Sequence, residues 1–127
     1  MKQKVLLVDD EEVLRRVMAR GLERHGYSVI QSDNGNEALK IAKQESPSLI
    51  ILDLVMPGLL GFEVCASLRK DERFSRTPII IMSAKSYKPD IDKAKELGAD
   101  AYVVKPIEIG ELVRLAQEHL DKRTNLP

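Results

Sequence analysis

The sequence has little cysteine and no long apolar run, and each shortage excludes a class of protein. Among its 127 residues Cys65 is the single cysteine, so no disulfide can form within the chain. Together with His25 and His119 it is also too little for a Cys/His zinc cluster. The N-terminal apolar run Val5–Val8 is too short for a signal peptide or a membrane span. We therefore expect a cytoplasmic protein that does not contact a membrane.

Net charge is absent as well, because 20 basic residues balance 20 acidic ones. This balance argues against broad electrostatic binding, so we expect no direct contact with nucleic acid.

With 43% hydrophobic residues, residues 1–127 are expected to form one domain, with a core from about residue 4 to residue 120. Since carboxylates are the only abundant metal ligands, a bound metal is expected to be a cation such as Mg²⁺.

Short apolar runs alternate with helical patterns along the chain. The runs are Val5–Val8, Tyr27–Ile30, Leu49–Leu52, Ile79–Met82 and Ala101–Val104. Because they are uniformly apolar, they predict strands covered on both faces. Apolar residues at helical spacing lie between and after them, at Leu14–Leu22, Ala38–Ala42, Phe62–Leu68, Ile91–Leu97 and Ile109–Leu120. The pattern predicts a three-layer, doubly wound α/β fold, (βα)5, with a parallel five-stranded sheet in the order 2-1-3-4-5.

Polar residues follow four of the five runs. Asp9 and Asp10 come after the first, Asp53 after the third, Ser83 after the fourth and Lys105 after the fifth. Ligands of open parallel sheets bind outside the carboxyl ends of the strands, so we expect these side chains to share one hollow. Carboxylates about 5 Å apart repel by roughly 3 kcal/mol at an effective dielectric constant of about 20. One Mg²⁺ ion would balance the excess negative charge.

Four segments resemble those of a known family. They are D-D at residues 9–10, I-L-D-L-V-M-P-G around Asp53, I-M-S-A around Ser83 and V-V-K-P around Lys105, and G-A-D-A-Y precedes the last. In this order and spacing the chain resembles the CheY-like receiver domain of two-component response regulators. The resemblance extends over nearly the whole chain, from about Lys4 to about Leu120.

The resemblance implies a phosphorylation-controlled signalling switch. Asp53 would accept a phosphoryl group from a sensor histidine kinase or a phosphotransfer protein. Lys105 and Ser83 would hold that group. Taken alone, Lys105 also fits an ordinary surface lysine, but a cis peptide before Pro106 would aim its side chain inward. Such a domain catalyses its own phosphorylation and dephosphorylation, and we do not expect an enzyme that acts on a separate substrate.

The resemblance also implies a Mg²⁺ site and the residues that control the lifetime of the phosphate. Asp10, Asp53 and the backbone carbonyl of Val55 would bind the ion directly, with Asp9 acting through water. Val55 and Lys85 occupy the two positions that tune autodephosphorylation in this family. Neither side chain has a carboxylate or an amide to position an attacking water, so a long-lived phosphate is expected.

The resemblance also implies a conformational switch that links the phosphorylation site to a surface of the domain. Ser83 and Tyr102 would respond to the phosphoryl group and alter the surface of the fourth helix, fifth strand and fifth helix. Taken alone, Tyr102 fits an aromatic residue at the edge of the core equally well. A downstream protein partner or an output domain would read this surface, and a homodimer through it stays open. The sequence fits both a stand-alone regulator and a piece of a longer protein.

Three other functions compete with this one. A flavodoxin-like electron carrier would have the same fold but a phosphate loop rich in serine and threonine after the first strand, where this chain has acids. A phosphatase of the haloacid-dehalogenase type would have a D-x-D motif, whereas Leu54 and Val55 follow Asp53. A receiver domain used only for docking would not need the acidic residues.

Overall fold

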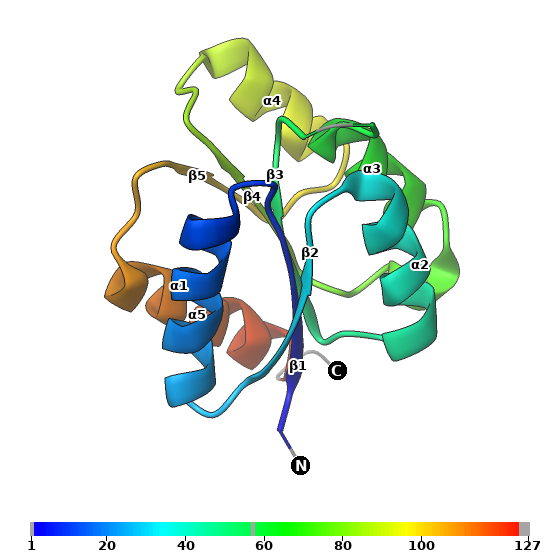
Figure 1. Ribbon diagram of the computed structural model, residues 1–127. Coiled ribbons are helices and arrows are strands. Elements are labelled where there is room, and N and C mark those ends of the chain that lie inside the picture. The colour runs from blue at the N-terminus through cyan, green and yellow to red at the C-terminus, as the bar shows by residue number, and fades with distance from the viewer. Residues whose placement is uncertain (1, 57, 125–127) are drawn as a thin grey trace.

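The computed structural model describes residues 2–56 and 58–124 and shows a parallel sheet between two layers of helices (Figure 1). The strand order is β2-β1-β3-β4-β5, as predicted. The elements are β1 (Lys4–Val8), α1 (Glu12–Arg24), β2 (Ser28–Ser32), α2 (Gly35–Glu45), β3 (Leu49–Asp53), α3 (Gly61–Arg69), the 3₁₀ turn η1 (Glu72–Phe74), β4 (Ile79–Ser83), α4 (Lys88–Glu96), β5 (Ala101–Val104) and α5 (Ile109–Thr124). None of these helices is long and apolar enough to cross a membrane.

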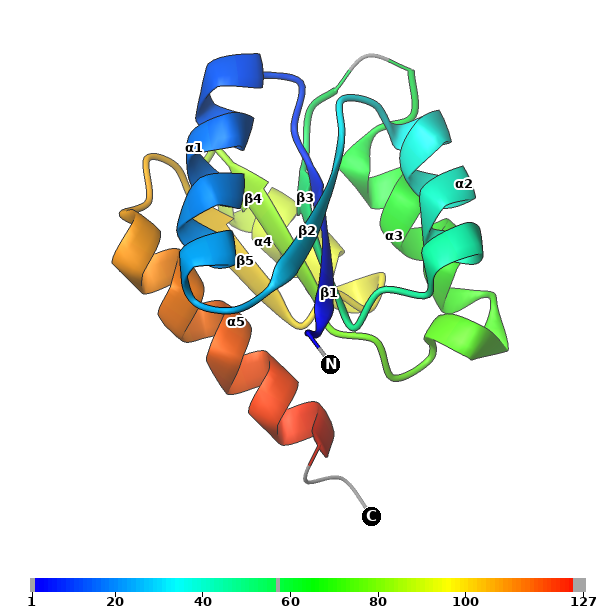
Figure 2. The same ribbon diagram turned by 60° about the horizontal axis from the view of Figure 1, so that its bottom comes forward.

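The helices divide between the two faces of the sheet. Helices α1 and α5 cover one face, and α2, α3 and α4 cover the other (Figures 1 and 2). Neighbouring residues of a strand point to opposite faces, so Leu6 and Val8 pack with α2 and α3, whereas Val5 and Leu7 pack with α1 and α5. Two covered faces explain why each central strand has four consecutive apolar residues, at Val5–Val8, Leu49–Leu52 and Ile79–Met82.

The predicted burial holds for the central strands and is wrong for the edges. Strands β3 and β4 are buried at every residue, and β1 is buried from Val5 on. In β5, by contrast, the first three residues are partly exposed and Val104 is 41% exposed. An edge strand has a neighbour on one side only and lies at the margin of both helical layers. The second strand also starts at Ser28 rather than Tyr27.

Local signals in the sequence set the helix ends. The Asn34 side chain accepts a hydrogen bond from the Glu37 backbone N–H at 2.9 Å and so caps α2. Gly26 and Gly98 follow α1 and α4 with φ of 95° and 100°, a conformation that favours glycine. Ser46 ends α2 in the same left-handed region, which the sequence pattern does not predict.

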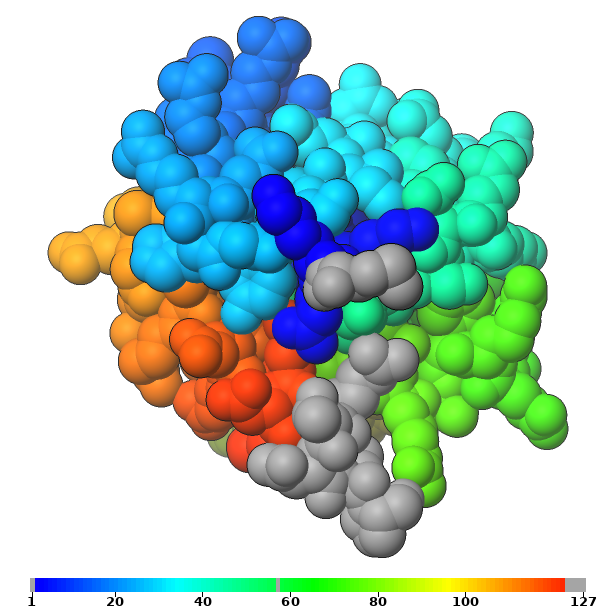
Figure 3. Space-filling model, turned by 90° about the horizontal axis from the view of Figure 1, so that it is seen from below, coloured from blue at the N-terminus to red at the C-terminus, as the bar shows by residue number. Residues whose placement is uncertain are grey.

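The two edges of the sheet differ in what they carry. The start of β1 and the end of α5 share the face at the amino ends of the strands (Figure 3). All five strands are parallel, so the loops that leave their carboxyl ends emerge together at the opposite edge. That edge is where the polar residues of the sequence pattern gather.

Gly61 lets α3 begin directly against the end of β3. A Cβ atom there would lie 2.5 Å from the Asp53 carbonyl oxygen and 2.9 Å from the Leu54 Cα atom. We predict that Gly61→Ala lowers the free energy of unfolding by about 1–3 kcal/mol in urea titrations, because the backbone beside Asp53 must shift. The matched control is Gly110→Ala in α5, where nothing lies within 4 Å of the added atom. This control should leave stability unchanged or raise it by up to about 1 kcal/mol, and equal losses in both variants would contradict the interpretation.

Candidate functional site

The register of the sheet brings polar residues from four strands to one rim. Strands β1 and β3 are paired up to their last apolar residues, so Asp9 and Asp53 lie side by side at the rim. On the other side of β3, the pairing of β4 with β5 extends to Ser83. The backbone N–H of Lys105 donates to the Ser83 carbonyl at 2.7 Å, which continues the ladder into the loop. Residues far apart in the sequence therefore meet because of strand order alone.

Lys105 is the centre of a buried ion cluster. Its Nζ atom lies 2.8 Å from Asp9 Oδ2 and 3.1 Å from Asp53 Oδ2. Asp9 is fully buried and Asp53 is 6% exposed. The peptide between Lys105 and Pro106 is cis, as expected from the sequence. A buried carboxylate needs a partner, and here two carboxylates share one ammonium group.

The third carboxylate, that of Asp10, is exposed at the mouth of the same hollow. Carboxylate oxygens of Asp9, Asp10 and Asp53 lie within 4.8 Å of one another. Mg²⁺ binds oxygen ligands at about 2.1 Å, so oxygens this close need only a small movement to share one ion. The donor set therefore fits Mg²⁺. The hollow has a volume of about 320 Å³ and is lined by Asp10, Glu11, Asp53, Val55, Ser83, Ala84, Lys85 and Lys105.

Burial and charge shift the pKa values of the two central groups. Burial raises the pKa of the Asp53 carboxyl above its ordinary value, and the hydrogen bond and charge of Lys105 do not cancel the effect. For Lys105, burial alone would lower the pKa, but hydrogen bonds to Asp9 and Asp53 outweigh it and raise the pKa. Lys105 thus stays charged at neutral pH, while the ionised form of Asp53 is disfavoured.

The remaining predicted residues lie around this cluster. Ser83 is buried, and its Oγ accepts a hydrogen bond from the Lys85 backbone N–H at 3.0 Å. Val55 is 50% exposed, and its backbone N–H lies 3.4 Å from Asp53 Oδ1. The Tyr102 hydroxyl donates to the Lys85 carbonyl at 2.8 Å. Ser83 and Tyr102 are therefore both bonded to the backbone of Lys85, one from inside the hollow and one from outside.

Two residues near the cluster were not assigned from the sequence. Glu11 Oε1 lies 3.8 Å from Lys105 Nζ, and its position directly after the paired aspartates is a signal that could have found it. Arg15 Nη1 donates to the Asp9 carbonyl at 2.9 Å. A side-chain bond to a backbone carbonyl leaves no trace in the sequence pattern, so no comparable signal exists for Arg15.

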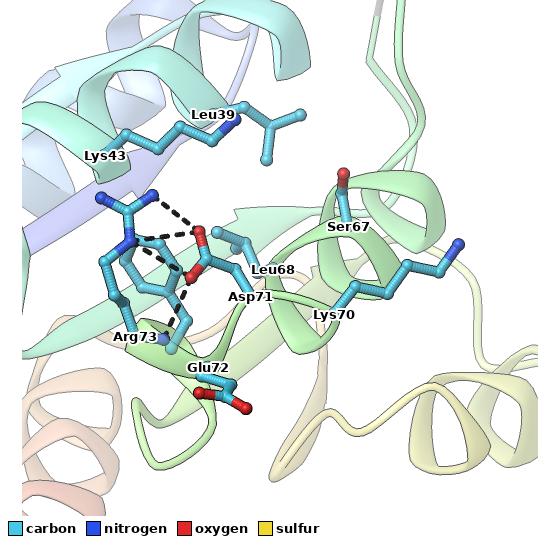
Figure 4. Close-up of a pocket in the computed structure, with 9 residues that line it drawn as sticks. Leu39, Lys43, Ser67, Leu68, Lys70, Asp71, Glu72 and Arg73 are labelled. Atoms are coloured by element: carbon cyan, nitrogen blue, oxygen red, sulfur yellow. Dashed lines mark hydrogen bonds and ion pairs between the residues drawn. The ribbon is translucent and has the colours of Figure 1, made fainter.

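A larger pocket, of about 570 Å³, lies away from this cluster between the C-terminal ends of α2 and α3 (Figure 4). The guanidinium group of Arg73, which lines this pocket, pairs with the Asp71 carboxylate at 2.7 Å. Lys43 approaches from α2, and the exposed Lys70 points away from the Arg73–Asp71 pair (Figure 4). We assign the chemistry to the rim of the sheet, because there two buried carboxylates contact the same ammonium group.

Comparison with known proteins agrees with this architecture. Residues 5–117 match the family model described as the response regulator receiver domain. The chain belongs to this family. This membership favours the signalling interpretation over the electron-carrier and phosphatase alternatives.

Two relatives and one solved structure illustrate the similarity. This receiver domain is 44% identical to "Probable transcriptional regulator ycf27" of Porphyridium aerugineum, over 99% of this chain and 54% of that protein. It is 44% identical to "Alkaline phosphatase synthesis transcriptional regulatory protein PhoP" of Bacillus subtilis, over 88% of this chain and 46% of that protein. The chain therefore spans about half the length of these curated relatives. The chemotaxis response regulator CheY4 of Vibrio cholerae superimposes with a TM-score of 0.89 at 30% identity, over 94% of this chain and 99% of that one, and confirms the fold class.

We predict that Asp53 destabilises the metal-free domain at neutral pH. Its pKa is higher in the folded state than the roughly 3.9 of an unfolded chain, so the folded state holds the proton more tightly. Stability is therefore lost as the pH rises from that unfolded value through the raised folded one. In chelator-treated buffer at neutral pH, urea unfolding should show Asp53→Asn to be more stable than the wild type. The difference should shrink as the pH falls toward about 4.

The control for this experiment is Glu72→Gln, which neutralises an exposed acid away from the rim and should leave stability unchanged at every pH. A wild type that is more stable than Asp53→Asn at neutral pH without metal would contradict the assigned charge balance.

Proposed function

We propose that this receiver domain accepts a phosphoryl group on Asp53 in a Mg²⁺-dependent reaction. The observation that supports the proposal most strongly is the cluster itself, in which Asp53 Oδ2 lies 3.1 Å from Lys105 Nζ and beside two further carboxylates. Receiver domains of response regulators act as phosphorylation switches in two-component systems. In this proposal the domain catalyses its own phosphorylation and dephosphorylation and has no separate substrate to turn over.

In the proposed transfer, a carboxylate oxygen of Asp53 attacks phosphorus as the bond from phosphorus to the donor's imidazole nitrogen breaks, and the electron pair of that bond leaves with the imidazole. The Lys105 ammonium and the Ser83 hydroxyl donate hydrogen bonds to oxygens of the arriving group. Such a transfer depends mainly on positioning and charge neutralisation, and these side chains supply both.

The proposed Mg²⁺ site uses the acids of the rim and one carbonyl. When bound, Mg²⁺ would offset the negative charge of the phosphoryl oxygens. Asp10, Asp53 and the carbonyl of Val55 would hold it. Both carboxylate oxygens of Asp9 already accept hydrogen bonds, from Glu11 N–H at 2.9 Å and from Lys105 at 2.8 Å. This arrangement supports a role for Asp9 through water rather than by direct ligation.

The proposed switch passes through the backbone of Lys85. A Ser83 hydroxyl that turns toward the phosphoryl group releases the Lys85 N–H, and the Lys85 carbonyl is the acceptor for Tyr102. The phosphoryl group then favours one of two arrangements of this segment. Tyr87 and Val104 are 65% and 41% exposed on the adjoining α4–β5–α5 surface. We propose this surface for contact with a downstream protein, with an output domain or with a second receiver domain.

The partners follow from the same proposal. A sensor histidine kinase or a phosphotransfer protein supplies the phosphoryl group. The relatives of about twice this length are named as transcriptional regulators, which supports control of an output domain. We propose that residues 1–127 are one receiver domain, with its core at about 4–120, that makes no direct contact with nucleic acid or membrane. A cytoplasmic location stays a prediction.

The direct test is labelling with acetyl phosphate in the presence of Mg²⁺. Wild-type protein should become phosphorylated, and Asp53→Asn should not, because the nucleophilic oxygen is replaced by an amide. The matched control is Asp71→Asn in the pocket between α2 and α3, which should label like the wild type. Labelling of Asp53→Asn at the wild-type rate, measured by phosphate-sensitive gel electrophoresis, would exclude Asp53 as the acceptor.

The phosphorylated form should be long-lived. Val55 is half exposed at the mouth of the hollow, and its side chain has no amide that could position a water molecule there. We expect Val55→Asn to shorten the half-life of the phosphorylated domain several-fold in a chase with Mg²⁺, and Val55→Leu to leave it unchanged. Decay of the wild type within seconds, or equal half-lives for the wild type and Val55→Asn, would count against this prediction.

A further inference from the structure

The orientation of the Asp10 side chain is set by the backbone that carries it. Among residues 2–56 and 58–124, no hydrogen bond or ion pair holds its carboxylate, which is exposed. Yet this carboxylate lies within 4.8 Å of those of Asp9 and Asp53. The peptide groups around Asp10 must therefore be held by other parts of the molecule if its side chain is to stay aimed at the hollow.

In the short loop between β1 and α1, three hydrogen bonds hold the three consecutive peptide groups from the Asp9 N–H to the Glu11 N–H. The Asp9 N–H donates to the Ser32 carbonyl at 3.0 Å, and the Glu11 N–H donates to Asp9 Oδ1 at 2.9 Å. The third comes from Arg15, whose Nη1 donates to the Asp9 carbonyl at 2.9 Å. That carbonyl belongs to the peptide joining Asp9 to Asp10, so the Arg15 bond directly limits rotation of the peptide that carries Asp10.

Arg15 is itself held by a second bond. Its Nε donates to Gln31 Oε1 at 3.1 Å, on strand β2. One planar guanidinium group thus joins the edge strand, the first turn of α1 and the loop. Lysine has one ammonium group and no rigid fork, so it cannot make both contacts in this fixed geometry.

We propose that Arg15 is a positioning residue for the Mg²⁺ site, acting through the Asp9–Asp10 peptide to aim the Asp10 carboxylate. This inference rests on the proposed function. Groups that hold a metal ligand from behind commonly change metal affinity by about 10-fold to 100-fold when they are removed. Arg15 would hold Asp10 through the backbone carbonyl of Asp9 rather than through the Asp10 carboxylate itself.

The direction in which Mg²⁺ affinity changes when Arg15 is replaced distinguishes a positioning role from a purely electrostatic one. A guanidinium group close to a cation site repels the cation, so loss of the charge alone would tighten Mg²⁺ binding. Loss of positioning weakens it. Arg15→Met removes both the charge and the bonds, whereas Arg15→Lys keeps the charge and loses the fork. Weaker binding in both variants is therefore a result that charge alone cannot give.

The test is a Mg²⁺ titration followed by the amide NMR signals of Asp10 and Glu11 in unphosphorylated protein. We expect Arg15→Met to raise the Kd for Mg²⁺ about tenfold, and Arg15→Lys to raise it as well. Arg16→Met is the matched control, because Arg16 is exposed on the next position of α1 and pairs with Glu12 there; its Kd should equal that of the wild type. In metal-free protein the Glu11 amide should exchange with solvent faster in Arg15→Met than in the wild type.

The outcomes distinguish this inference from the proposed function. An unchanged or lower Kd in folded Arg15→Met overturns the inference alone. Absence of Mg²⁺ binding to the wild type overturns the proposed function and the inference together. If Arg15→Met does not fold, Gln31→Leu replaces it, because loss of the Nε partner should loosen Arg15 and weaken binding to a smaller extent. A Kd equal to that of the wild type in Gln31→Leu then contradicts the inference.

Discussion

Asp9 and Asp53 are buried within reach of a single ammonium group, that of Lys105, and a third carboxylate stands at the mouth of the same hollow. Such a cluster is not stabilising in itself, because each carboxylate loses hydration and one ammonium cannot compensate for all of them. The raised pKa of Asp53 expresses this imbalance. The fold must therefore hold these groups together with packing and hydrogen bonds that lie elsewhere.

The packing comes from the central strands. Strands β1 and β3 are paired side by side and are buried on both faces, so the ends from which Asp9 and Asp53 emerge have little freedom to move apart. Gly61 adds to this by letting α3 lie against the last residues of β3. Functional sites in proteins often reduce stability, which the remaining structure must make up. Here the same rigidity that holds repelling groups together prepares them to bind a cation and a phosphoryl group.

The fold was accessible from the sequence because its signals are local and agree with one another. Uniform apolar runs mark the strands, and Asn34, Gly26 and Gly98 mark helix ends. The rule that ligands of parallel sheets bind at the carboxyl ends of the strands then brings Asp53 and Lys105 to one edge. The exposure of β5 could not be seen, because an edge strand and a central strand differ in their neighbours rather than in their own residues.

The details of the site were less accessible than its location. Each selected residue follows an apolar run of the sequence, so the ends of the runs were enough to select Asp9, Asp10, Asp53, Ser83 and Lys105. Contacts between a side chain and a backbone carbonyl depend on the conformation of loops, which no periodic pattern encodes. For this reason the bonds of Arg15 to the Asp9 carbonyl and of Tyr102 to the Lys85 carbonyl appear only in three dimensions.

In the function proposed for this domain, the shared cluster makes Asp53 the acceptor of a phosphoryl group. Borohydride reduces an aspartyl phosphate to homoserine, so peptide mapping by mass spectrometry after treatment with acetyl phosphate and borohydride locates the modified residue. We expect homoserine at position 53, present with Mg²⁺ and absent with a chelator. Homoserine at another aspartate, or equal conversion of Asp53 with and without Mg²⁺, would contradict it.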